Sequence, residues 1–293
     1  MKNNNLRPLF KWSGGKRKEI KLFRDHYPED FKVFVEPFVG AGAVYFDLNF
    51  EGQNFIADTH DELICFLKQC RSAETMSKIA AFMRNPWQPI LKSKPAKARQ
   101  EDIYDSLPEE FKRQGEATYY FVRDGMKTTN DLSKACRFYY LRKTAYRGMI
   151  RYNPKLEFNI PWGKYKNVNF EDMHNEEYSK LLSRTTIRTC SFVETMKKFE
   201  KNKDAFIFLD PPYDSEFTDY KTPFGKSDHA DLADCFKKSK AKCLMIIGDT
   251  PYIRKLYEGY IVEEYDKKYQ FRLKDGRIKA GDIDNLHLVI KNY

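Results

Sequence analysis

The chain has 293 residues, and its 52 Lys and Arg against 42 Asp and Glu give a formal net charge of +10 and a pI near 9.1. This length exceeds one typical domain and suits a catalytic domain that contains an inserted second domain. The 6 cysteines are scattered without a CxxC pair and the 5 histidines do not cluster, which argues against a disulfide scaffold and against a bound metal. The first residues are polar and no apolar run is long enough to span a membrane, so we expect a soluble, intracellular protein with no membrane partner.

The positive charge is concentrated in the middle of the chain. Residues 84–166 contain 18 Lys and Arg against 9 Asp and Glu, which leaves the rest of the chain nearly neutral. Within residues 137–166, eight basic residues accompany one acid, Glu157, and they are interleaved with the aromatic residues Phe138, Tyr139, Tyr140, Tyr146, Tyr152, Trp162 and Tyr165. Basic groups neutralise phosphates, and aromatic rings stack on bases or wedge between them. The stretch therefore predicts a surface for a nucleic acid, although basic surfaces also serve solubility alone.

The first predicted elements are a strand and a helix joined by a glycine-containing turn. Residues 33–36 predict the strand, Pro37–Gly42 the turn, and the helix begins near Ala43. The turn lacks the complete three-glycine fingerprint of dinucleotide-binding folds, so it does not predict a bound pyrophosphate. Gly40 and Gly42 still allow a ligand to approach the backbone closely, although a Gly-x-Gly pair alone is often only a tight turn.

A second strand is predicted directly after this unit. Residues 54–57 form a short, mainly apolar run that ends in Asp58. An acid at the tip of the second strand is where folds of this kind bind the hydroxyl groups of a ribose. Asp58 is therefore a candidate ligand for a nucleoside.

The basic middle of the chain predicts a separate, mainly helical unit. Residues 85–95 contain three prolines and predict a loop, whereas residues 117–124 and 132–142 have the helical spacing of aromatic and aliphatic side chains. We expect residues 61–168 to form an inserted DNA-binding domain with a hairpin near residues 143–166.

The strands resume after this insert, so residues 1–60 and 169–293 are predicted to form one α/β domain. The expected elements are strands at residues 186–190, 205–209 and 243–247, a helix at 252–257, and a terminal hairpin of residues 260–269 and 285–293. Parallel strands that alternate with helices indicate a Rossmann-like sheet, and the hairpin predicts a terminal antiparallel strand.

The most specific motif is the tetrapeptide Asp210-Pro211-Pro212-Tyr213, which follows the predicted strand at residues 205–209. The exocyclic amine of adenine is a poor nucleophile until its protons are drawn aside, and Asp210 and the carbonyl of Pro211 can each accept one of them. Proline suits this role because its fixed φ and missing N–H hold the carbonyl outward. Tyr213 supplies a stacking face for a base that has been swung out of the duplex. The alternative is an ordinary proline turn after a strand.

The glycine turn, the ribose acid and the amine pocket together indicate a nucleoside cofactor without phosphates. S-adenosylmethionine fits this description better than NAD does. The predicted reaction is an in-line transfer of the methyl group to the 6-amino group of adenine, in which Asp210 and Pro211 act by orientation and electrostatics and no covalent enzyme intermediate forms.

The order of these motifs resembles the Dam-type, D12 class of site-specific DNA adenine methyltransferases over most of the chain. The matching segments are Lys11–Lys16, Val35–Gly42, Ala57–Asp58, Arg151–Asn153, Glu157–Lys166 and Asp210–Tyr213. The resemblance implies a methyltransferase sheet with an inserted target-recognition domain. It also implies a set of S-adenosylmethionine contacts, namely Trp12, Gly15, Lys16, Phe38, Gly40, Gly42, Asp58 and Asp210.

The same resemblance implies double-stranded DNA as the partner. The expected DNA contacts are Lys11, Tyr146, Arg147, Arg151, Asn153, Lys164, Tyr165 and Lys166. Tyr146 is the candidate wedge beside the flipped base, and Arg151 is the candidate for a bidentate contact with guanine, with a phosphate contact as the alternative. The chain departs from the family at Arg142 and Arg147, where relatives often have Asn, so the common target GATC is only a guess.

Other functions remain open from the sequence. The same fold can methylate the 4-amino group of cytosine, or an RNA base or a protein amide, and a catalytically silent DNA-binding relative would have the same outline. The sequence also leaves open whether a restriction endonuclease acts on the same site and whether the enzyme is a monomer.

Overall fold

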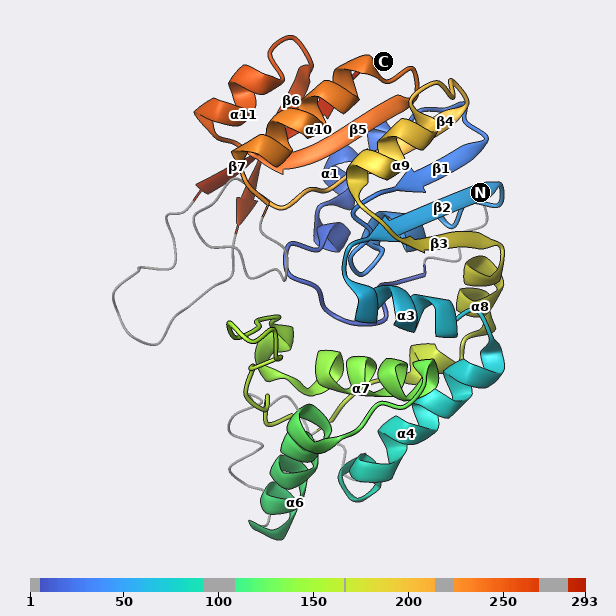
Figure 1. The fold of residues 1–293 in the computed structure, drawn as a ribbon, viewed down its shortest axis with the longest axis vertical. Helices are drawn as coiled ribbons and strands as arrows, with labels where there is room; N and C mark the ends of the chain where they lie inside the picture. Colours follow the sequence, from blue (N-terminus) through green and yellow to red (C-terminus); the bar gives the residue numbers. More distant parts are fainter. Residues whose placement is uncertain (1–5, 92–108, 166, 214–223, 269–283) are drawn as a thin grey trace.

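A seven-stranded sheet forms the centre of the upper half of the molecule in Figure 1. The computed structural model describes residues 6–91, 109–165, 167–213, 224–268 and 284–293. The strand order is β3-β2-β1-β4-β5-β7-β6, and β7 runs antiparallel to both of its neighbours. The strands are β1 (Val33–Glu36), β2 (Gln53–Asp58), β3 (Thr185–Thr189), β4 (Ala205–Leu209), β5 (Lys242–Gly248), β6 (Ile261–Lys268) and β7 (Asp284–Lys291). The predicted Rossmann-like sheet with a terminal antiparallel strand is confirmed.

Helices cover both faces of the sheet, which is why the central strand β4 is apolar along its whole length. All five residues of β4 are buried, as expected for a parallel strand with helices on both sides. The helices are α1 (Ile20–Phe23), α2 (Ala43–Leu48), α3 (Asp61–Gln69), α4 (Ala73–Leu91), α6 (Glu109–Tyr120), α7 (Asp131–Thr144), α8 (Glu176–Ser183), α9 (Phe192–Phe199), α10 (Lys226–Lys238) and α11 (Pro251–Leu256). In Figure 1, α9, α10 and α11 lie in front of the sheet and α1 lies behind it.

Two hydrophobic cores follow from the alternation of side chains along the strands. Val35 and Ile207 point to the face that carries α9 to α11, where they pack with residues such as Phe236 of α10. Their neighbours Phe34 and Phe206 point to the opposite face and belong to a larger cluster. This second cluster continues beyond the sheet into the helices that lie between β2 and β3 in the chain.

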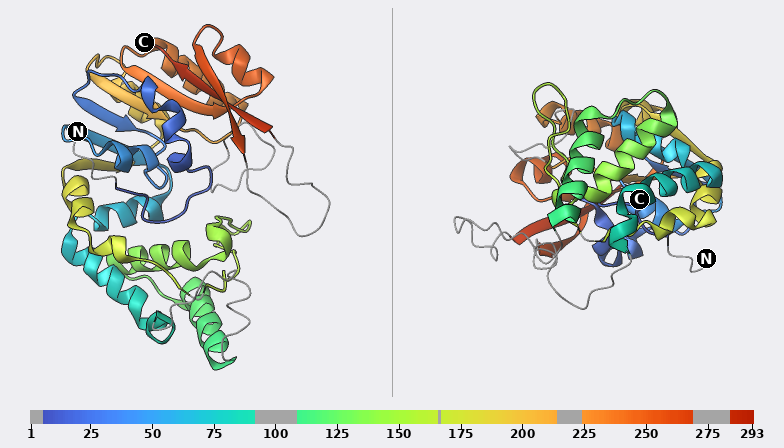
Figure 2. Two further views of the ribbon diagram at one scale, coloured as in Figure 1. Left: turned by 180° about the vertical axis from the view of Figure 1, so that it is seen from behind. Right: turned by 90° about the horizontal axis from the view of Figure 1, so that it is seen from below.

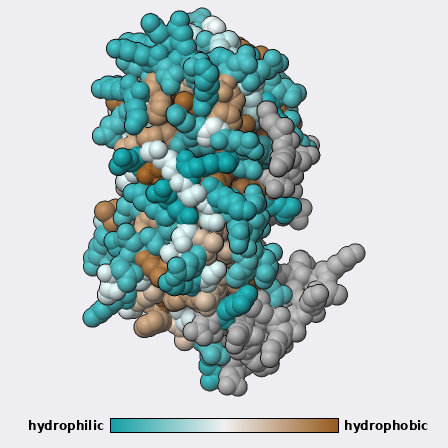
Figure 3. Space-filling model, turned by 90° about the vertical axis from the view of Figure 1, so that its right-hand side faces the viewer, coloured by the Kyte–Doolittle hydropathy of each residue, from teal (hydrophilic) through white to brown (hydrophobic). Residues whose placement is uncertain are grey.

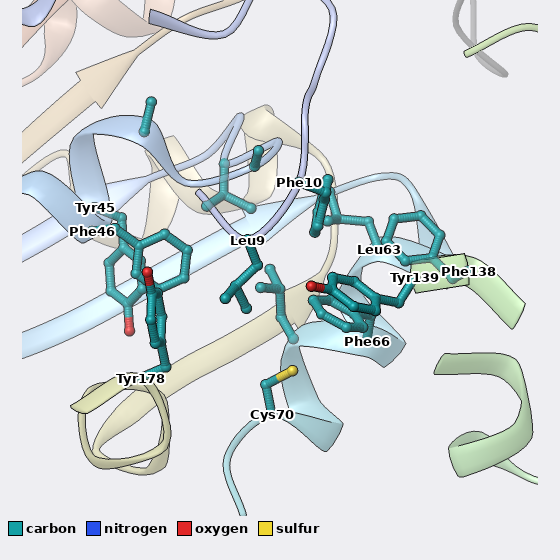
Figure 4. Packing of buried hydrophobic residues seen from close by; sticks show 14 of the residues in the cluster. Leu9, Phe10, Tyr45, Phe46, Leu63, Phe66, Cys70, Phe138, Tyr139 and Tyr178 are labelled. Carbon is teal, nitrogen blue, oxygen red and sulfur yellow. The ribbon is translucent and has the colours of Figure 1, made fainter. Parts of the chain in front are cut away.

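The helices α3, α4, α6 and α7 form the lower half of the molecule in Figures 1 and 2, beside the β3 edge of the sheet. The close-up in Figure 4 shows how α3 joins them to the sheet. Phe66 of α3 stacks on Tyr139 of α7, with ring centroids 5.2 Å apart and planes only 5° from parallel. The ring of Phe10 meets the Phe66 ring edge-on, with centroids 5.5 Å apart, and the ring of Phe138 lies tilted against Phe66, with centroids 5.6 Å apart. The helical part and the sheet therefore share one continuous core.

The predicted helices in this region are confirmed, because residues 117–124 lie in α6 and the π-helical turn Phe121–Gly125, and residues 132–142 lie in α7. The prediction of a loop at residues 85–95 is wrong for its first part, since α4 continues to Leu91 through Pro86 and Pro89. The apolar residues of the earlier turns, such as Met76 and Met83, are fully buried and anchor α4. Tertiary packing thus outweighs the helix-breaking tendency of the two prolines. Residues 92–95 lie outside the described part of the chain.

The predicted hairpin follows α7 and is held by a few backbone pairs. Bridges join Ala145 to Trp162 and Tyr152 to Phe158. The predicted terminal hairpin is β6 and β7, whose connecting residues 269–283 lie outside the described residues. Hydrophilic residues cover most of the face shown in Figure 3, where hydrophobic residues form small groups. Within the described ranges, none of the helices combines the length and hydropathy that crossing a bilayer would require.

Replacing Phe66 tests whether the sheet and the helical part form one core. Phe66→Ala should lower the free energy of unfolding by about 3 to 5 kcal/mol, because it leaves a cavity among the rings of Phe10, Phe138 and Tyr139. Urea unfolding followed by circular dichroism and by fluorescence should give one shared transition. Phe121→Ala is the matched control, because Phe121 is 63% exposed, and it should change the stability by less than about 0.5 kcal/mol. Two separate transitions, or a loss below about 1 kcal/mol for Phe66→Ala, would contradict a shared core.

Candidate active site

Three neighbouring strands each end in a carboxylate. Glu36 is the last residue of β1, Asp58 the last of β2, and Asp210 follows β4 directly. In the sheet these strands lie in the order β2-β1-β4 and run parallel, so the three acids gather at one edge. The chain leads from β1 outward to β3 on one side and from β4 to β5 on the other. The acids therefore flank the topological switch point, where open α/β sheets bind their ligands.

Asp210 is paired with a lysine from the amino-terminal loop. Nζ of Lys16 donates to Oδ1 of Asp210, to the hydroxyl of Tyr213 at 2.8 Å and to the carbonyl of Gly14 at 3.1 Å. The side chain of Lys16 is 1% exposed and that of Asp210 is 21% exposed. The lysine is thus buried beneath the motif, while the carboxylate keeps one side open. Sequence analysis placed Lys16 at the cofactor, and the structure adds its direct contact with the predicted catalytic residues.

The electrostatics of Asp210 reflect two opposing influences. Burial raises the pKa of Asp210 above its ordinary value, and the positive charge and hydrogen bond of Lys16 oppose that rise. Loss of a buried lysine partner would leave an unpaired carboxylate, which burial disfavours strongly. Lys16 therefore favours the ionised form of Asp210, which accepts hydrogen bonds.

The glycine turn lies against Trp12 and the second-strand acid. Gly40 has a positive φ of +47°, and a Cβ atom there would come within 2.8 Å of the Trp12 indole. Its N–H donates to Oδ2 of Asp58 at 3.0 Å, and the N–H of His60 donates to Oδ1 at 2.9 Å. Burial raises the pKa of Asp58 while these backbone N–H groups lower it. Because Gly40 has no side chain, its backbone lies uncovered between the indole of Trp12 and the carboxylate of Asp58.

Glu36 is a site residue that the sequence analysis did not single out. It is 2% exposed, and Oε2 accepts a hydrogen bond from the N–H of Tyr45 at 3.2 Å. Burial and the nearby charge of Asp210 raise the pKa of Glu36 well above its ordinary value. The sequence contained a pattern that could have identified Glu36, because this residue follows an apolar run and precedes a proline, as Asp210 does.

These residues line one large cleft with a volume of about 1040 Å³. Sites for one small ligand are usually about 300 to 1,000 Å³, so the cleft has room for a nucleoside and a second group. The predicted residues that line it are Lys11, Trp12, Gly15, Lys16, Phe38, Gly40, Asp58, Arg147, Asp210, Pro211, Pro212 and Tyr213. Phe38 forms part of an aromatic wall, with Phe192 stacked on it at 5.4 Å. Gly42 lies outside this lining and precedes α2 with a φ of +72°.

Arg142, one of the departures from the family pattern, connects the cleft to the hairpin. It is 4% exposed, and its guanidinium donates to the carbonyls of Lys11 at 2.9 Å, Met149 at 2.8 Å and Gly148. Its charge lies 5.5 Å from the centre of the Trp12 ring. Arg142 therefore supports the loops around the cleft and presents no charge to solvent.

The remaining predicted DNA contacts lie on or beside the hairpin, outside the lining of the cleft. Tyr146 is 37% exposed, and Arg151 is exposed, with Nε donating to Asn159 at 2.9 Å. Asn153 is engaged in the turn, where Oδ1 accepts from the N–H groups of Lys155 and Glu157 at 2.9 Å and 3.0 Å.

Backbone strain is concentrated in this hairpin. Arg147, Leu156 and Lys164 are three of the four non-glycine residues with positive φ in the described part of the chain. Such strain often accompanies functional segments. Lys164 is exposed and Tyr165 half-buried, whereas Lys166 lies outside the described residues.

The comparisons with known proteins agree with this geometry. The D12 class N6 adenine-specific DNA methyltransferase family matches residues 12–272. The chain is 42% identical over 290 residues to the Type II methyltransferase M.CviBI of Paramecium bursaria Chlorella virus NC1A, which covers 98% of this chain and 100% of the relative. It is 30% identical over 312 residues to the Type II methyltransferase M.MjaIII of Methanocaldococcus jannaschii, with 98% and 99% covered. It is also 29% identical over 264 residues to a DNA adenine methylase of Vibrio cholerae, with 86% and 85% covered. These matches confirm the resemblance predicted from the motifs, and the chain belongs to the D12 class of N6 adenine-specific DNA methyltransferases.

Proposed function

We propose that this adenine-specific DNA methyltransferase takes its methyl group from S-adenosylmethionine and modifies an adenine that has been swung out of the duplex into the cleft beside Asp210. The observation that carries the proposal is the position of Asp210. It lies at the switch point of the sheet, is paired with Lys16 and adjoins Tyr213. The family assignment favours the adenine amine over the cytosine amine that the sequence left open.

The polar groups and the backbone surface of the cleft fit S-adenosylmethionine. Asp58 has both oxygens oriented by backbone N–H groups and retains lone pairs for ribose hydroxyls. The backbone of Gly40, where a side chain would collide with Trp12, leaves a flat surface for a nucleoside. No phosphate-binding set is needed, in agreement with the incomplete glycine fingerprint. When bound, S-adenosylmethionine supplies an activated methyl group on a sulfonium.

The residues of the motif prepare the adenine amine. Asp210 accepts one hydrogen of the amine and stabilises the positive charge that develops on nitrogen, and the carbonyl of Pro211 accepts the other. Tyr213 stacks on the base, with its hydroxyl fixed by Lys16 at 2.8 Å. These interactions aim the nitrogen lone pair at the methyl group, so the protein contributes mainly orientation.

We assign the DNA contacts to the helical part and its hairpin, with residues 61–168 as the target-recognition domain and residues 1–60 and 169–293 as the catalytic domain. Tyr146 would wedge beside the flipped base. Arg151 would read a guanine edge, and Lys11 and Lys164 would contact phosphates. The structure supports this through the exposure of Tyr146, Arg151 and Lys164 on one hairpin. A restriction endonuclease acting on the same site is a further candidate partner.

Replacing Asp210 tests the assignment of the amine pocket. Asp210→Ala should lower methyl transfer to unmethylated plasmid DNA by at least about a hundredfold, because the amine loses its main acceptor. Nucleoside analysis should show 6-methyladenine for the wild type, and calorimetry should still detect S-adenosylmethionine binding to the variant. Asp204→Ala is the matched control, since Asp204 adjoins the other end of β4 and pairs on the surface with Lys32 at 3.0 Å. Near wild-type turnover of Asp210→Ala would remove Asp210 from the mechanism.

The pH dependence of the reaction reports the ionisation of Asp210. Burial raises the pKa of Asp210 and Lys16 lowers it, and only the ionised carboxylate accepts the hydrogen of the amine. Activity should therefore fall as the pH drops through this pKa. Lys16→Met removes the opposing charge, so the acid limb of kcat should move to higher pH. A limb that stays in place, or moves to lower pH, would show that Lys16 does not control the ionisation of Asp210.

Two hairpin variants separate base reading from phosphate binding. Arg151→Ala should relax the sequence preference at one position of the target, at a cost of about 1 to 3 kcal/mol in discrimination. Lys164→Ala should weaken binding evenly across sequences and reduce its salt dependence. Methylation of a randomised plasmid library, read by single-molecule sequencing, measures both effects. If both variants lose activity uniformly across sequences, Arg151 does not read a base.

A further inference from the structure

A buried carboxylate that the amine pocket does not use lies directly behind it. Glu19 is 5% exposed and follows the short helical turn that contains Lys16, with its N–H donating to the carbonyl of Lys16 at 2.7 Å. Buried acids rarely occur without partners, because removing the charge from water is costly. The described partners of its carboxylate come from the terminal hairpin, more than two hundred residues away in the chain.

Three residues of the hairpin surround this carboxylate. The hydroxyl of Tyr265 donates to Oε2 at 3.0 Å, and Nδ1 of His287 lies 2.7 Å from the same oxygen. Nζ of Lys267 lies 2.8 Å from Oε1. Tyr265 and His287 are direct partners across β6 and β7, so the pairing of these strands presents both to Glu19 at once. Glu19 therefore ties the terminal hairpin to the turn that carries Lys16.

The same hairpin residues touch Tyr213 of the motif. The ring of His287 meets the Tyr213 ring edge-on at 5.3 Å, and Nζ of Lys267 lies 5.8 Å from the centre of that ring. Lys16 also contacts this tyrosine, with Nζ 5.0 Å from the centre of the Tyr213 ring and 2.8 Å from its hydroxyl. The groups around the Tyr213 ring thus include two partners of Glu19 and the lysine of its own turn.

We propose that Glu19 is a positioning residue for methyl transfer, which holds His287 and Lys267 against Tyr213 and thereby fixes the stacking face for the adenine and the ammonium of Lys16 at Asp210. The proposal rests on the function assigned above to Asp210 and Tyr213. Glu19 itself does not touch the reacting atoms. Through Glu19, the terminal hairpin would contribute to catalysis although neither of its strands carries a motif.

Charge balance gives Glu19 a second part in the site. Among the described residues, the cations Lys16 and Lys267 face the anions Asp210 and Glu19. Burial alone would raise the pKa of Glu19, but His287, Lys16 and Lys267 lower it to about 2, so the group stays ionised. Burial lowers the pKa of His287, which keeps that ring neutral near pH 7. Within this group of four, removing the charge of Glu19 therefore leaves one positive charge in excess.

The direct test is Glu19→Gln, which keeps the size of the side chain and removes its charge. We expect kcat to fall about 10- to 100-fold, because a small displacement of an orienting group costs that much, while the affinity for DNA stays within about threefold.

In the enzyme without cofactor, NMR titration of Glu19→Gln should show a lower pKa for His287, since Glu19 raises that pKa. The acid limb of kcat should move to lower pH, because Asp210 faces Lys16, Lys267, Glu36 and Glu19, and Glu19 raises its pKa.

Two further variants separate positioning from a merely structural role. Glu19→Gln combined with Lys267→Met restores the charge balance among these groups and should lower kcat no further than Glu19→Gln alone, because both residues act through one network, whereas independent structural damage would add. Glu263→Gln is the matched control, because Glu263 lies on β6 with Tyr265 and Lys267, is half exposed and, like Glu19, contacts a histidine, in its case His26 at 2.5 Å. It should leave kcat within about twofold of the wild type.

Several outcomes would overturn the proposal. A kcat for Glu19→Gln within threefold of the wild type would do so, as would a double variant that is worse than the single one. If Glu19→Gln does not fold, Tyr265→Phe removes only one hydrogen bond to Glu19 and should lower kcat about threefold; an unchanged kcat would overturn the proposal. If Asp210→Ala is inactive and Glu19→Gln fully active, only this inference fails, whereas an active Asp210→Ala would defeat the pocket assignment itself.

Discussion

The site depends on the buried ion pair between Lys16 and Asp210. It joins two segments 194 positions apart in the sequence, the amino-terminal loop and the end of β4. Because Lys16 is buried, the pair must form for either charge to be tolerated inside the fold. Its formation places Tyr213 beneath the same ammonium and brings the loop of Trp12 against Gly40. The proposed amine pocket and the proposed nucleoside surface thus depend on one interaction.

The architecture makes this arrangement rigid. The switch point of the sheet gathers the carboxylates of Glu36, Asp58 and Asp210 at one edge, and helices on both faces fix the strands that carry them. The stacked rings of Phe66 and Tyr139 extend the core into the helical part (Figure 4), and Tyr152 of the hairpin bonds to His60 at 2.7 Å, two residues after Asp58. The hairpin proposed to contact DNA and the strand end proposed to bind the cofactor are therefore connected through short contacts.

Local patterns predicted the parts of the molecule that depend on local chemistry. The apolar run before Asp210 and the prolines after it were enough to identify the motif, and the alternation of strands and helices gave the Rossmann-like sheet. The contact of Lys16 with Asp210 and the cluster around Glu19 depend on tertiary folding, which brings distant segments together without any periodic signal. The helical course of residues 85–91 was missed for a related reason, since buried packing of α4 outweighs its prolines. Glu36 could have been found from its place at the end of β1.

The measurement that tests the central claim most directly is a crystal structure of the enzyme with an unreactive analogue of S-adenosylmethionine and duplex DNA that contains the target adenine. The account predicts a flipped adenine stacked on Tyr213, with its 6-amino nitrogen about 3 Å from both the Asp210 carboxylate and the Pro211 carbonyl. The Lys16–Asp210 pair should persist in that complex. An adenine that remains stacked in the duplex, or one whose amine faces away from Asp210, would contradict the account.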